Sequence, residues 1–215
     1  MKCIKCLICD TLCDSFEDTK RGVLYFECPT CHFIMKSKEH FSSLDTQKER
    51  YDLHINSEED EGYQEYFQRF IDFALSDIPK PKSVLDFGCG ASSLLAQMMQ
   101  KEGIACDFYD PIYHPNEHYK NETYDVITSV EVFEHLHDPK ATLEMLIQSL
   151  NPKGYIALQS AFHPHNRDKF LKWYYPHDPT HIVFYSLTSF EALAKRVDMS
   201  IVATNSKNMV LLQKL

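Results

Sequence analysis

Apolar positions follow two spacings along the last two thirds of the chain, and together they predict a sheet with helices on both faces. Short, largely apolar runs are typical of strands buried on both faces of a parallel sheet, and they lie at 84–87, 104–109, 124–129 and 155–159. Apolar residues recur at helical spacing over 94–99, 139–150 and 186–197. Two final runs, 199–204 and 209–212, predict an antiparallel hairpin that closes the sheet.

The stretch after the second predicted strand is too short for a complete crossover. Only 13 residues separate Asp110 from Tyr124, where the next strand begins. A helix and a further strand need roughly 20–30 residues. We therefore expect an α/β fold of Rossmann-like type in which the third strand is vestigial or missing.

A strand, a glycine turn and a helix follow one another between Lys82 and Asp110. Gly88 and Gly90 allow a tight turn and a close approach of a ligand, because neither carries a Cβ atom. Asp110 ends the next strand, twenty residues after Gly90, where an acid accepts hydrogen bonds from a ribose. A dinucleotide site would have a third glycine where this chain has Ser93. A nicotinamide-dependent oxidoreductase is therefore the weaker alternative.

Two stretches resemble motifs of one enzyme family. The run Val84 to Gly90, VLDFGCG, resembles motif I of the class I S-adenosylmethionine-dependent methyltransferases of types 11, 12 and 23. The run Tyr124 to Leu136, YDVITSVEVFEHL, with Asp138-Pro139 after it, resembles motif IV. The resemblance covers residues ~80–215 and implies an S-adenosylmethionine site built from Asp86, Gly88, Cys89, Gly90, Asp110, Pro111, Ser129 and Glu131.

The acceptor side of such an enzyme is expected after the fourth and fifth strands, because loops at the carboxyl ends of strands carry specificity. By the same resemblance, Glu134 and His135 of motif IV are candidates to orient the acceptor or take its proton, and the loop after the fifth strand adds His181 as a third candidate. His135 could instead cap the following helix. A metal site at His177 and His181 is disfavoured, because the intervening proline breaks the helix that such a pair needs.

Six of the eight cysteines lie in the first 31 residues, and this clustering indicates a metal site. Cys6-x-x-Cys9 and Cys28-x-x-Cys31 are separated by 18 residues, the spacing of a structural zinc site with four thiolates. Cys3-x-x-Cys6 is a competing first pair, and Cys13 and His32 are spare ligands. Redox chemistry of a C-x-x-C pair is the other interpretation. We predict a zinc ribbon that serves folding and docks on a protein partner.

Three segments follow from these patterns: a zinc ribbon over 1–40, a linker and N-terminal helix over 41–80, and the S-adenosylmethionine-binding domain over 81–215. The aromatic stripe from Tyr63 to Leu75 predicts the helix of the middle segment. In the resembling family this helix commonly covers the cofactor, so the candidates to contact the cofactor are Tyr51, His54, Asn56 and Tyr63.

Composition and charge narrow the class of acceptor. The 215 residues are 44% hydrophobic and 25% charged, as in ordinary globular proteins, and the net charge is −9. Residues 51–215 carry 14 basic and 23 acidic side chains, which disfavours binding of a nucleic-acid backbone. No apolar stretch approaches the ~20 residues that span a bilayer, and the first residues begin no apolar signal. We expect a cytoplasmic protein with no membrane or nucleic-acid partner.

The resemblance therefore predicts methyl transfer from S-adenosylmethionine to a small molecule, such as a sugar or a related metabolite. Lipid-linked intermediates and protein side chains stay open as acceptors. Residues 129–132, Ser-Val-Glu-Val, lack the (D/N)-P-P-(Y/F) motif of DNA-amino methylation. The alternative is a catalytically inactive adaptor that keeps the fold and uses the ribbon for docking on a protein.

Overall fold

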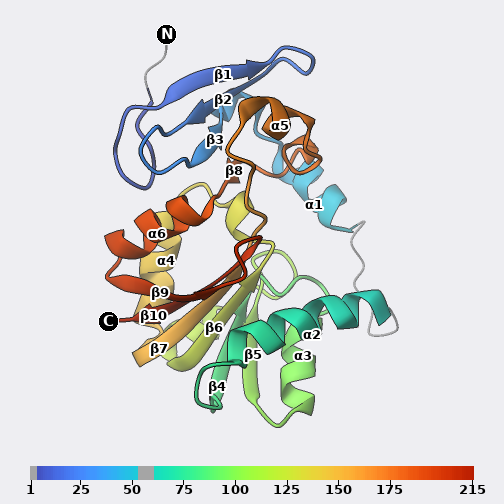
Figure 1. Ribbon diagram of the computed structural model, residues 1–215. Coiled ribbons are helices and arrows are strands. Elements are labelled where there is room, and N and C mark those ends of the chain that lie inside the picture. Colours follow the sequence, from blue (N-terminus) through green and yellow to red (C-terminus); the bar gives the residue numbers. More distant parts are fainter. Residues whose placement is uncertain (1–3, 53–60) are drawn as a thin grey trace.

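The computed structural model describes residues 4–52 and 61–215, which form two sheets stacked end to end (Figure 1). The larger sheet has the order β5-β4-β6-β7-β10-β9. Its strands are β4 (Ser83–Phe87), β5 (Ala105–Tyr109), β6 (Tyr124–Val130), β7 (Leu150–Gln159), β9 (Met199–Thr204) and β10 (Met209–Lys214). The smaller sheet consists of β1 (Asp14–Asp18), β2 (Val23–Glu27), β3 (Ile34–Lys36) and β8 (Val183–Phe184).

The larger sheet confirms the expected α/β fold. Strands β5, β4, β6 and β7 run parallel, and β10 is antiparallel to both β7 and β9. Within residues 61–215, β5 is the edge strand, because the chain goes on to β6 through an isolated bridge between Asp110 and His114 and the 3-10 helix η2 (Glu117–Asn121). The third strand is thus missing, as the 13-residue spacing predicted.

Helices cover both faces of the larger sheet (Figure 1). Helices α2 (Glu61–Leu75) and α3 (Leu94–Lys101) lie on one face, and α4 (Pro139–Gln148) and α6 (Leu187–Arg196) lie on the other. Strand β4 supplies both cores by alternation: Val84 packs in the cluster with α2 and α3, whereas Leu85 and Phe87 pack in the cluster with α4 and α6. Both faces of β4 are therefore dry, as its apolar sequence indicated.

Side chains cap the starts of helices α4 and α6, but not the start of α3. The Asp138 side chain accepts a hydrogen bond from the Ala141 N–H and caps α4, and Ser186 forms a capping box at α6. Ser93 precedes α3, but its backbone is left-handed (φ 46°) and its hydroxyl donates to the Ser92 carbonyl, so its side chain does not cap the helix.

The segment 161–185, which showed no periodicity in the sequence, is more ordered than a loop. It contains α5 (Arg167–Lys172), the 3-10 helix η4 (Tyr175–His177) and β8, which pairs antiparallel with β3 of the N-terminal segment. A strand of two residues is too short to give a periodic signal. The division of the chain near residues 40 and 80 stays a prediction, but the small sheet is built from both ends of the sequence.

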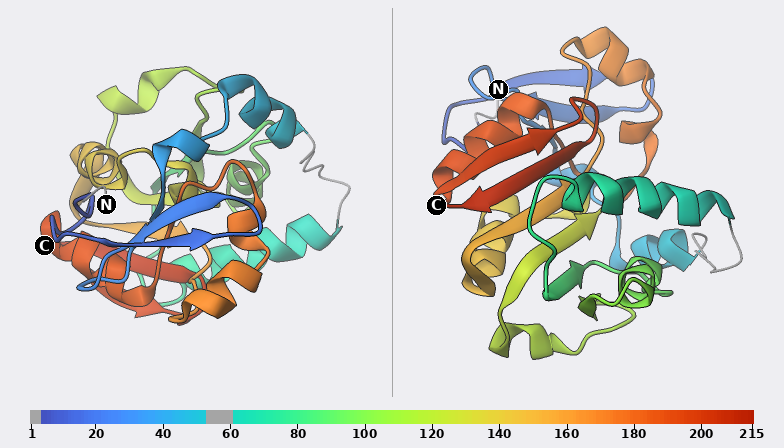
Figure 2. Two further views of the ribbon diagram at one scale, coloured as in Figure 1. Left: turned by 90° about the horizontal axis from the view of Figure 1, so that it is seen from above. Right: turned by 60° about the horizontal axis from the view of Figure 1, so that its bottom comes forward.

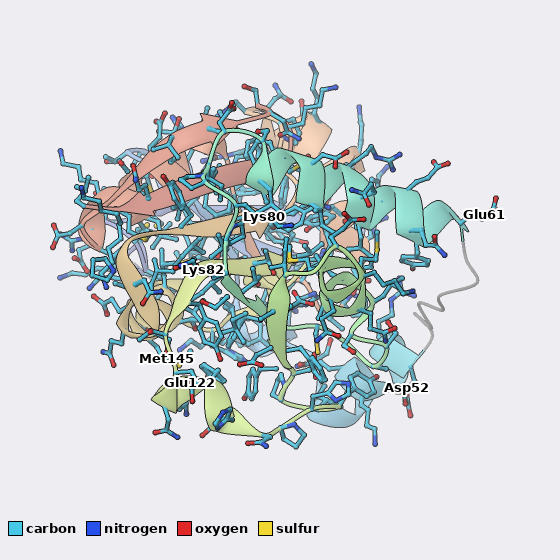
Figure 3. All side chains as sticks on the ribbon, turned by 90° about the horizontal axis from the view of Figure 1, so that it is seen from below. Asp52, Glu61, Lys80, Lys82, Glu122 and Met145 are labelled. Carbon is cyan, nitrogen blue, oxygen red and sulfur yellow. The ribbon has the colours of Figure 1, made fainter. Side chains whose placement is uncertain are left out.

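The small sheet lies over the carboxyl ends of the parallel strands (Figures 1 and 2). The Ile182 N–H donates to the Glu134 carbonyl (2.9 Å), and the Ile182 carbonyl accepts from the Lys36 N–H (2.8 Å). Figure 3 shows the molecule from its opposite end, where Lys80 and Lys82 precede strand β4. The N–H and the carbonyl of Ile182 thus connect β3 to the segment that follows β6.

An aromatic cluster attaches α5 to the small sheet. Phe170 is fully buried, and its ring centroid lies 5.2 Å from that of Tyr25 on β2 and 5.0 Å from that of Phe184 on β8. Both pairs meet edge to face, the geometry favoured by aromatic quadrupoles. This contact makes α5 part of the same folded unit as the small sheet.

We predict that Phe170→Ala lowers the free energy of unfolding by about 3–5 kcal/mol, because it leaves a cavity between β2 and β8. Tyr174→Ala is the matched control, since the Tyr174 side chain is 74% exposed and its loss should cost less than about 0.5 kcal/mol. Urea unfolding followed by circular dichroism measures both. Equal effects of the two substitutions would show that the cluster does not attach α5.

Candidate functional site

The two glycines after β4 play different parts in the turn. A Cβ atom on Gly88 would lie 2.2 Å from Cγ2 of Val132, so the close packing of the turn against Val132 requires glycine. Gly90 has φ +66°, and no atom lies within 4 Å of the place where its Cβ would be. Its backbone therefore borders open space, which a ligand can approach closely. Cys89, between them, donates its N–H to the Tyr109 carbonyl (3.1 Å).

The Asp110 carboxylate is held at the end of β5 by backbone donors. Oδ2 accepts from the Gly90 N–H (3.2 Å), and Oδ1 accepts from the N–H groups of Ile112 (2.8 Å) and Tyr113 (3.0 Å). Pro111 begins this turn. The structure thus brings Asp110 beside the glycine turn, with its position determined by three N–H groups.

Asp86 lies inside β4 and is almost fully buried. The Thr128 hydroxyl donates to its Oδ1 (3.2 Å). Burial raises the pKa of this carboxyl from its ordinary 3.8 to about 7. A buried acid that receives one hydrogen bond from the described part of the chain is costly for folding, so its place behind the glycine turn favours a role in binding.

Beyond the end of β6, Glu131 lies between two phenols. The Tyr66 hydroxyl of α2 donates to its Oε1 (3.1 Å), and the Tyr175 hydroxyl lies 3.0 Å from its Oε2. Burial, with the nearby Glu134 carboxylate as second cause, raises the pKa of Glu131 to about 8. Ser129, two residues earlier in β6, has a buried hydroxyl with no hydrogen-bond partner in the described part of the chain.

Sequence reasoning missed Tyr66 and Tyr175. Tyr66 lies in a stripe whose spacing indicates core, and Tyr175 lies in the segment that gave no periodic signal. Gln159, at the end of β7, also hydrogen-bonds the Tyr66 hydroxyl. The signal that the sequence offered was weak: each of these side chains carries a polar atom, which must find a hydrogen-bond partner when the side chain is buried.

Glu134, His135 and His181 meet beside this network. Glu134 is fully buried, and its Oε1 accepts from the Tyr175 hydroxyl (2.6 Å). The rings of His135 and His181 lie 4.8 Å apart between centroids. Burial lowers the pKa of His135, and burial together with His135 lowers that of His181 to about 3. All three acceptor-side candidates of the sequence therefore lie together.

Each histidine is oriented by a backbone carbonyl. His135 Nδ1 lies 3.0 Å from the Thr180 carbonyl, and His181 Nδ1 lies 2.9 Å from the Tyr175 carbonyl. His135 is not the cap of α4, since Asp138 takes that place. His177 Nε2 lies 3.1 Å from the Leu171 carbonyl, so His177 and His181 do not form the pair that was considered as a metal site.

The segment carrying His181 is supported by residues from outside the large sheet. The Asp178 carboxylate pairs with Arg50 of helix α1 (Leu44–Asp52) at 2.9 Å and accepts from the Thr180 hydroxyl at 2.6 Å. Burial opposes ionisation, but the bonds from Thr180 and Arg50 hold the pKa of Asp178 well below its usual range. Lys36 of β3 donates to the Asp178 carbonyl (3.4 Å). Strand β3 thus contacts the acceptor-side loop directly.

Four cysteine sulfurs gather at one end of the small sheet. The Sγ atoms of Cys6, Cys9, Cys28 and Cys31 all lie within 4.8 Å of one another. Three of their separations are 3.4, 3.6 and 3.7 Å, close to the ~3.8 Å edge of a zinc-thiolate tetrahedron with ~2.3 Å bonds. The Cys13 thiol contacts the Thr11 carbonyl instead, and Cys3 lies outside the described residues.

The candidates to cover the cofactor are only partly described. His54, Asn56 and the side chain of Tyr51 lie outside the described part of the structure. Tyr63 lies on α2 and packs against Phe67, with 6.5 Å between ring centroids. Its expected contact with a cofactor stays a prediction.

Comparison with known proteins gives one family. A model of the methyltransferase domain matches residues 60–204. A ubiquinone biosynthesis O-methyltransferase from Yersinia enterocolitica is 30% identical over 99 residues, which cover 35% of this chain and 40% of that protein. The chain therefore matches less than half of the length of this curated relative.

Solved methyltransferase structures share the fold. An O-methyltransferase family protein from Burkholderia thailandensis has a TM-score of 0.52 and 9% identity, covering 70% of this chain and 55% of that one. The plantazolicin methyltransferase BpumL, in complex with a monoazolic desmethylPZN analog and SAH, has a TM-score of 0.51 and 17% identity, covering 80% and 90%. Separately, none of the helices in residues 4–52 and 61–215 is long and apolar enough to cross a membrane.

The buried carboxyl of Asp86 gives a prediction with opposite signs for stability and binding. Its raised pKa means that its contribution to stability is present at acidic pH and lost as pH rises toward about 7. Asp86→Asn should therefore be more stable than the wild type at about pH 8, by at most about 4 kcal/mol, with a smaller gain at about pH 5. Its affinity for S-adenosylhomocysteine should fall.

Thermal unfolding at both pH values and calorimetric titration measure these effects. Asp77→Asn, at an exposed position, is the control and should change neither quantity. An Asp86→Asn variant that is less stable than the wild type at about pH 8 would contradict this account of the buried carboxyl.

Proposed function

The chain belongs to the class I S-adenosylmethionine-dependent methyltransferases, and on this premise we propose that it transfers a methyl group to a small-molecule acceptor held between Glu131 and His181. The observation that carries the proposal is the meeting of two sets of residues at the carboxyl ends of β4, β5 and β6. One set surrounds the glycine turn, and the other surrounds the Tyr175 hydroxyl.

The residues around the glycine turn suit the methyl donor. Gly90 borders open space, and Asp110 presents a carboxylate beside it, where ribose hydroxyls can donate. The unpartnered hydroxyl of buried Ser129 and the acids Asp86 and Glu131 offer acceptors for the amino-acid end of the donor. When bound, S-adenosylmethionine supplies an activated methyl group, and the protein's part is to align it with the acceptor atom. Cys89 and Pro111 would border the donor through the two turns.

The residues around Tyr175 suit an acceptor that must lose a proton. Carbonyl partners at Nδ1 of His135 and His181 place the proton on that nitrogen and direct the basic Nε2 lone pair away from the carbonyl. An imidazole in this state can accept a proton from a hydroxyl, amine or thiol. Glu134 and Glu131, connected by the Tyr175 hydroxyl, would orient the acceptor from the other side.

Two further parts of the proposal concern the substrate class and the ribbon. The BpumL structure holds a monoazolic desmethylPZN analog together with SAH. By analogy we propose a small molecule as the acceptor here, for example a sugar or a related metabolite. The four-cysteine group would hold a structural zinc ion, since four thiolates leave no open position for catalysis. A cytoplasmic location and a protein partner of the ribbon stay predictions.

We predict that the zinc-loaded protein binds S-adenosylhomocysteine. Asp110→Ala should weaken this binding at least about tenfold, because the two hydrogen bonds that the ribose hydroxyls donate to the Asp110 carboxylate are lost. Asp77→Ala, an exposed acid, should bind as the wild type does. Isothermal titration calorimetry measures both. Absence of binding to the wild type would reject the enzyme and favour the adaptor that keeps only the fold.

We further predict that His181→Ala lowers kcat by about 10²–10⁴-fold with an unchanged Kd for S-adenosylhomocysteine, because His181 acts on the acceptor and not on the donor. The acceptor is first found by a screen with S-adenosylmethionine labelled in the methyl group. His177→Ala is the control, since this histidine hydrogen-bonds the Leu171 carbonyl and does not belong to the group of Glu134, His135 and His181. Equal activity of His181→Ala and the wild type would remove His181 from the proposal.

A further inference from the structure

Outside the cysteine group, one other set of side chains in the described residues has the composition of a metal site. One ligand atom each from Glu134, His135 and His181 lies within 4.8 Å of the other two. Two imidazoles and one carboxylate form a common ligand set for zinc and for other divalent transition metals. The sequence did not suggest this set, because His181 lies 46 residues beyond His135.

The histidines are prepared as ligands by their hydrogen bonds. A backbone carbonyl can only accept, so Nδ1 of His135 donates to the Thr180 carbonyl and Nδ1 of His181 donates to the Tyr175 carbonyl. In a neutral ring this leaves the lone pair on Nε2, which lies 4.0 Å from Glu134 Oε1 in His135. Donation of the second ring N–H to a carbonyl is the usual arrangement around metal-bound histidine.

Glu134 adds an independent observation. Its side chain is fully buried, and one oxygen, Oε1, accepts from the Tyr175 hydroxyl at 2.6 Å. The other oxygen, Oε2, has no hydrogen-bond partner in the described part of the chain. A buried carboxylate oxygen without a partner is costly. The Glu134 oxygen near His135 Nε2 is Oε1, so a rotation of the carboxyl group that turns Oε2 toward the histidines would let a cation offset that cost. The Tyr175 contact would meanwhile orient the carboxylate from behind.

The dimensions are compatible with one ion. Ligands on a zinc ion with bonds of ~2.0–2.1 Å lie ~3.4 Å apart, so small side-chain rotations from the present separations would close the site. Three protein ligands leave a position open for a further donor atom. The His135 side chain is 17% exposed, which gives an ion a route of entry from solvent.

We propose that Glu134, His135 and His181 bind a divalent transition metal such as Zn²⁺, separate from the ion of the ribbon. The open position would accept an oxygen, nitrogen or sulfur atom of the methyl acceptor, and this last point rests on the function proposed above. With the ion in place, both histidines would bind the cation through Nε2 and could not act as bases. The metal-bound acceptor would then release its proton to solvent water, as the bond from the acceptor atom to the methyl carbon forms and the bond from that carbon to sulfur breaks.

Metal content of the purified protein after equilibration with buffered Zn²⁺ tests the site. We expect two zinc ions per chain in the wild type and one in His181→Ala and in Glu134→Gln. His177→Ala should keep two. A wild type with one ion, or variants that keep two, would overturn the proposal, whatever the affinity for S-adenosylhomocysteine.

Two controls separate this result from folding and from the proposed function. Circular dichroism and titration with S-adenosylhomocysteine on the same samples identify a variant that loses metal because it is unfolded. If His181→Ala is unfolded, the zinc content of Glu134→Gln, which keeps the shape of the side chain, decides whether the second site exists. Asp110→Ala should lose the adenosyl ligand and keep both ions. Two ions without any adenosyl binding in the wild type would reject the methyltransferase activity and leave the metal site standing.

Discussion

The backbone of Ile182 connects the small sheet to the segment that follows β6 of the large sheet. Its N–H bonds to the Glu134 carbonyl after β6, and its carbonyl accepts from the Lys36 N–H of β3. Buried peptide groups must be paired, so neither bond is readily given up. The position of His181, one residue earlier, therefore depends on both sheets. The small sheet, which the sequence suggested as a docking module, forms the support of the acceptor-side loop in the structure.

This connection changes what zinc would do for the protein. A structural zinc ion is worth about 10–16 kcal/mol of folding free energy in small zinc modules, which would otherwise not fold. Here the module holds β3, and β3 holds β8. The contacts of Lys36 and Arg50 with Asp178 extend the same support toward His181. Metal in the ribbon would thus affect acceptor chemistry without touching the acceptor.

The sequence predicted those parts of the site that are local in the chain. Gly88, Gly90 and Asp110 belong to one strand-turn-helix-strand unit, and the structure brings them together as that unit requires. The missing third strand followed from chain length alone. Tyr66 and Tyr175 escaped prediction because they reach Glu131 from 65 and 44 residues away. The β3–β8 pair escaped for the same reason, since two residues of β8 carry no period of their own.

Hydrogen exchange with mass spectrometry tests most directly whether the small sheet supports the segment that carries His181. It compares the protein after zinc is added to the proposed four-cysteine site with the protein after a chelator has removed it. We predict that removal of zinc by a chelator increases exchange over residues 163–184 as well as over residues 4–36. Residues 83–101, around the glycine turn, should keep their protection. Increased exchange confined to residues 4–36 would contradict the account, because it would show that the ribbon unfolds without releasing the segment that carries His181.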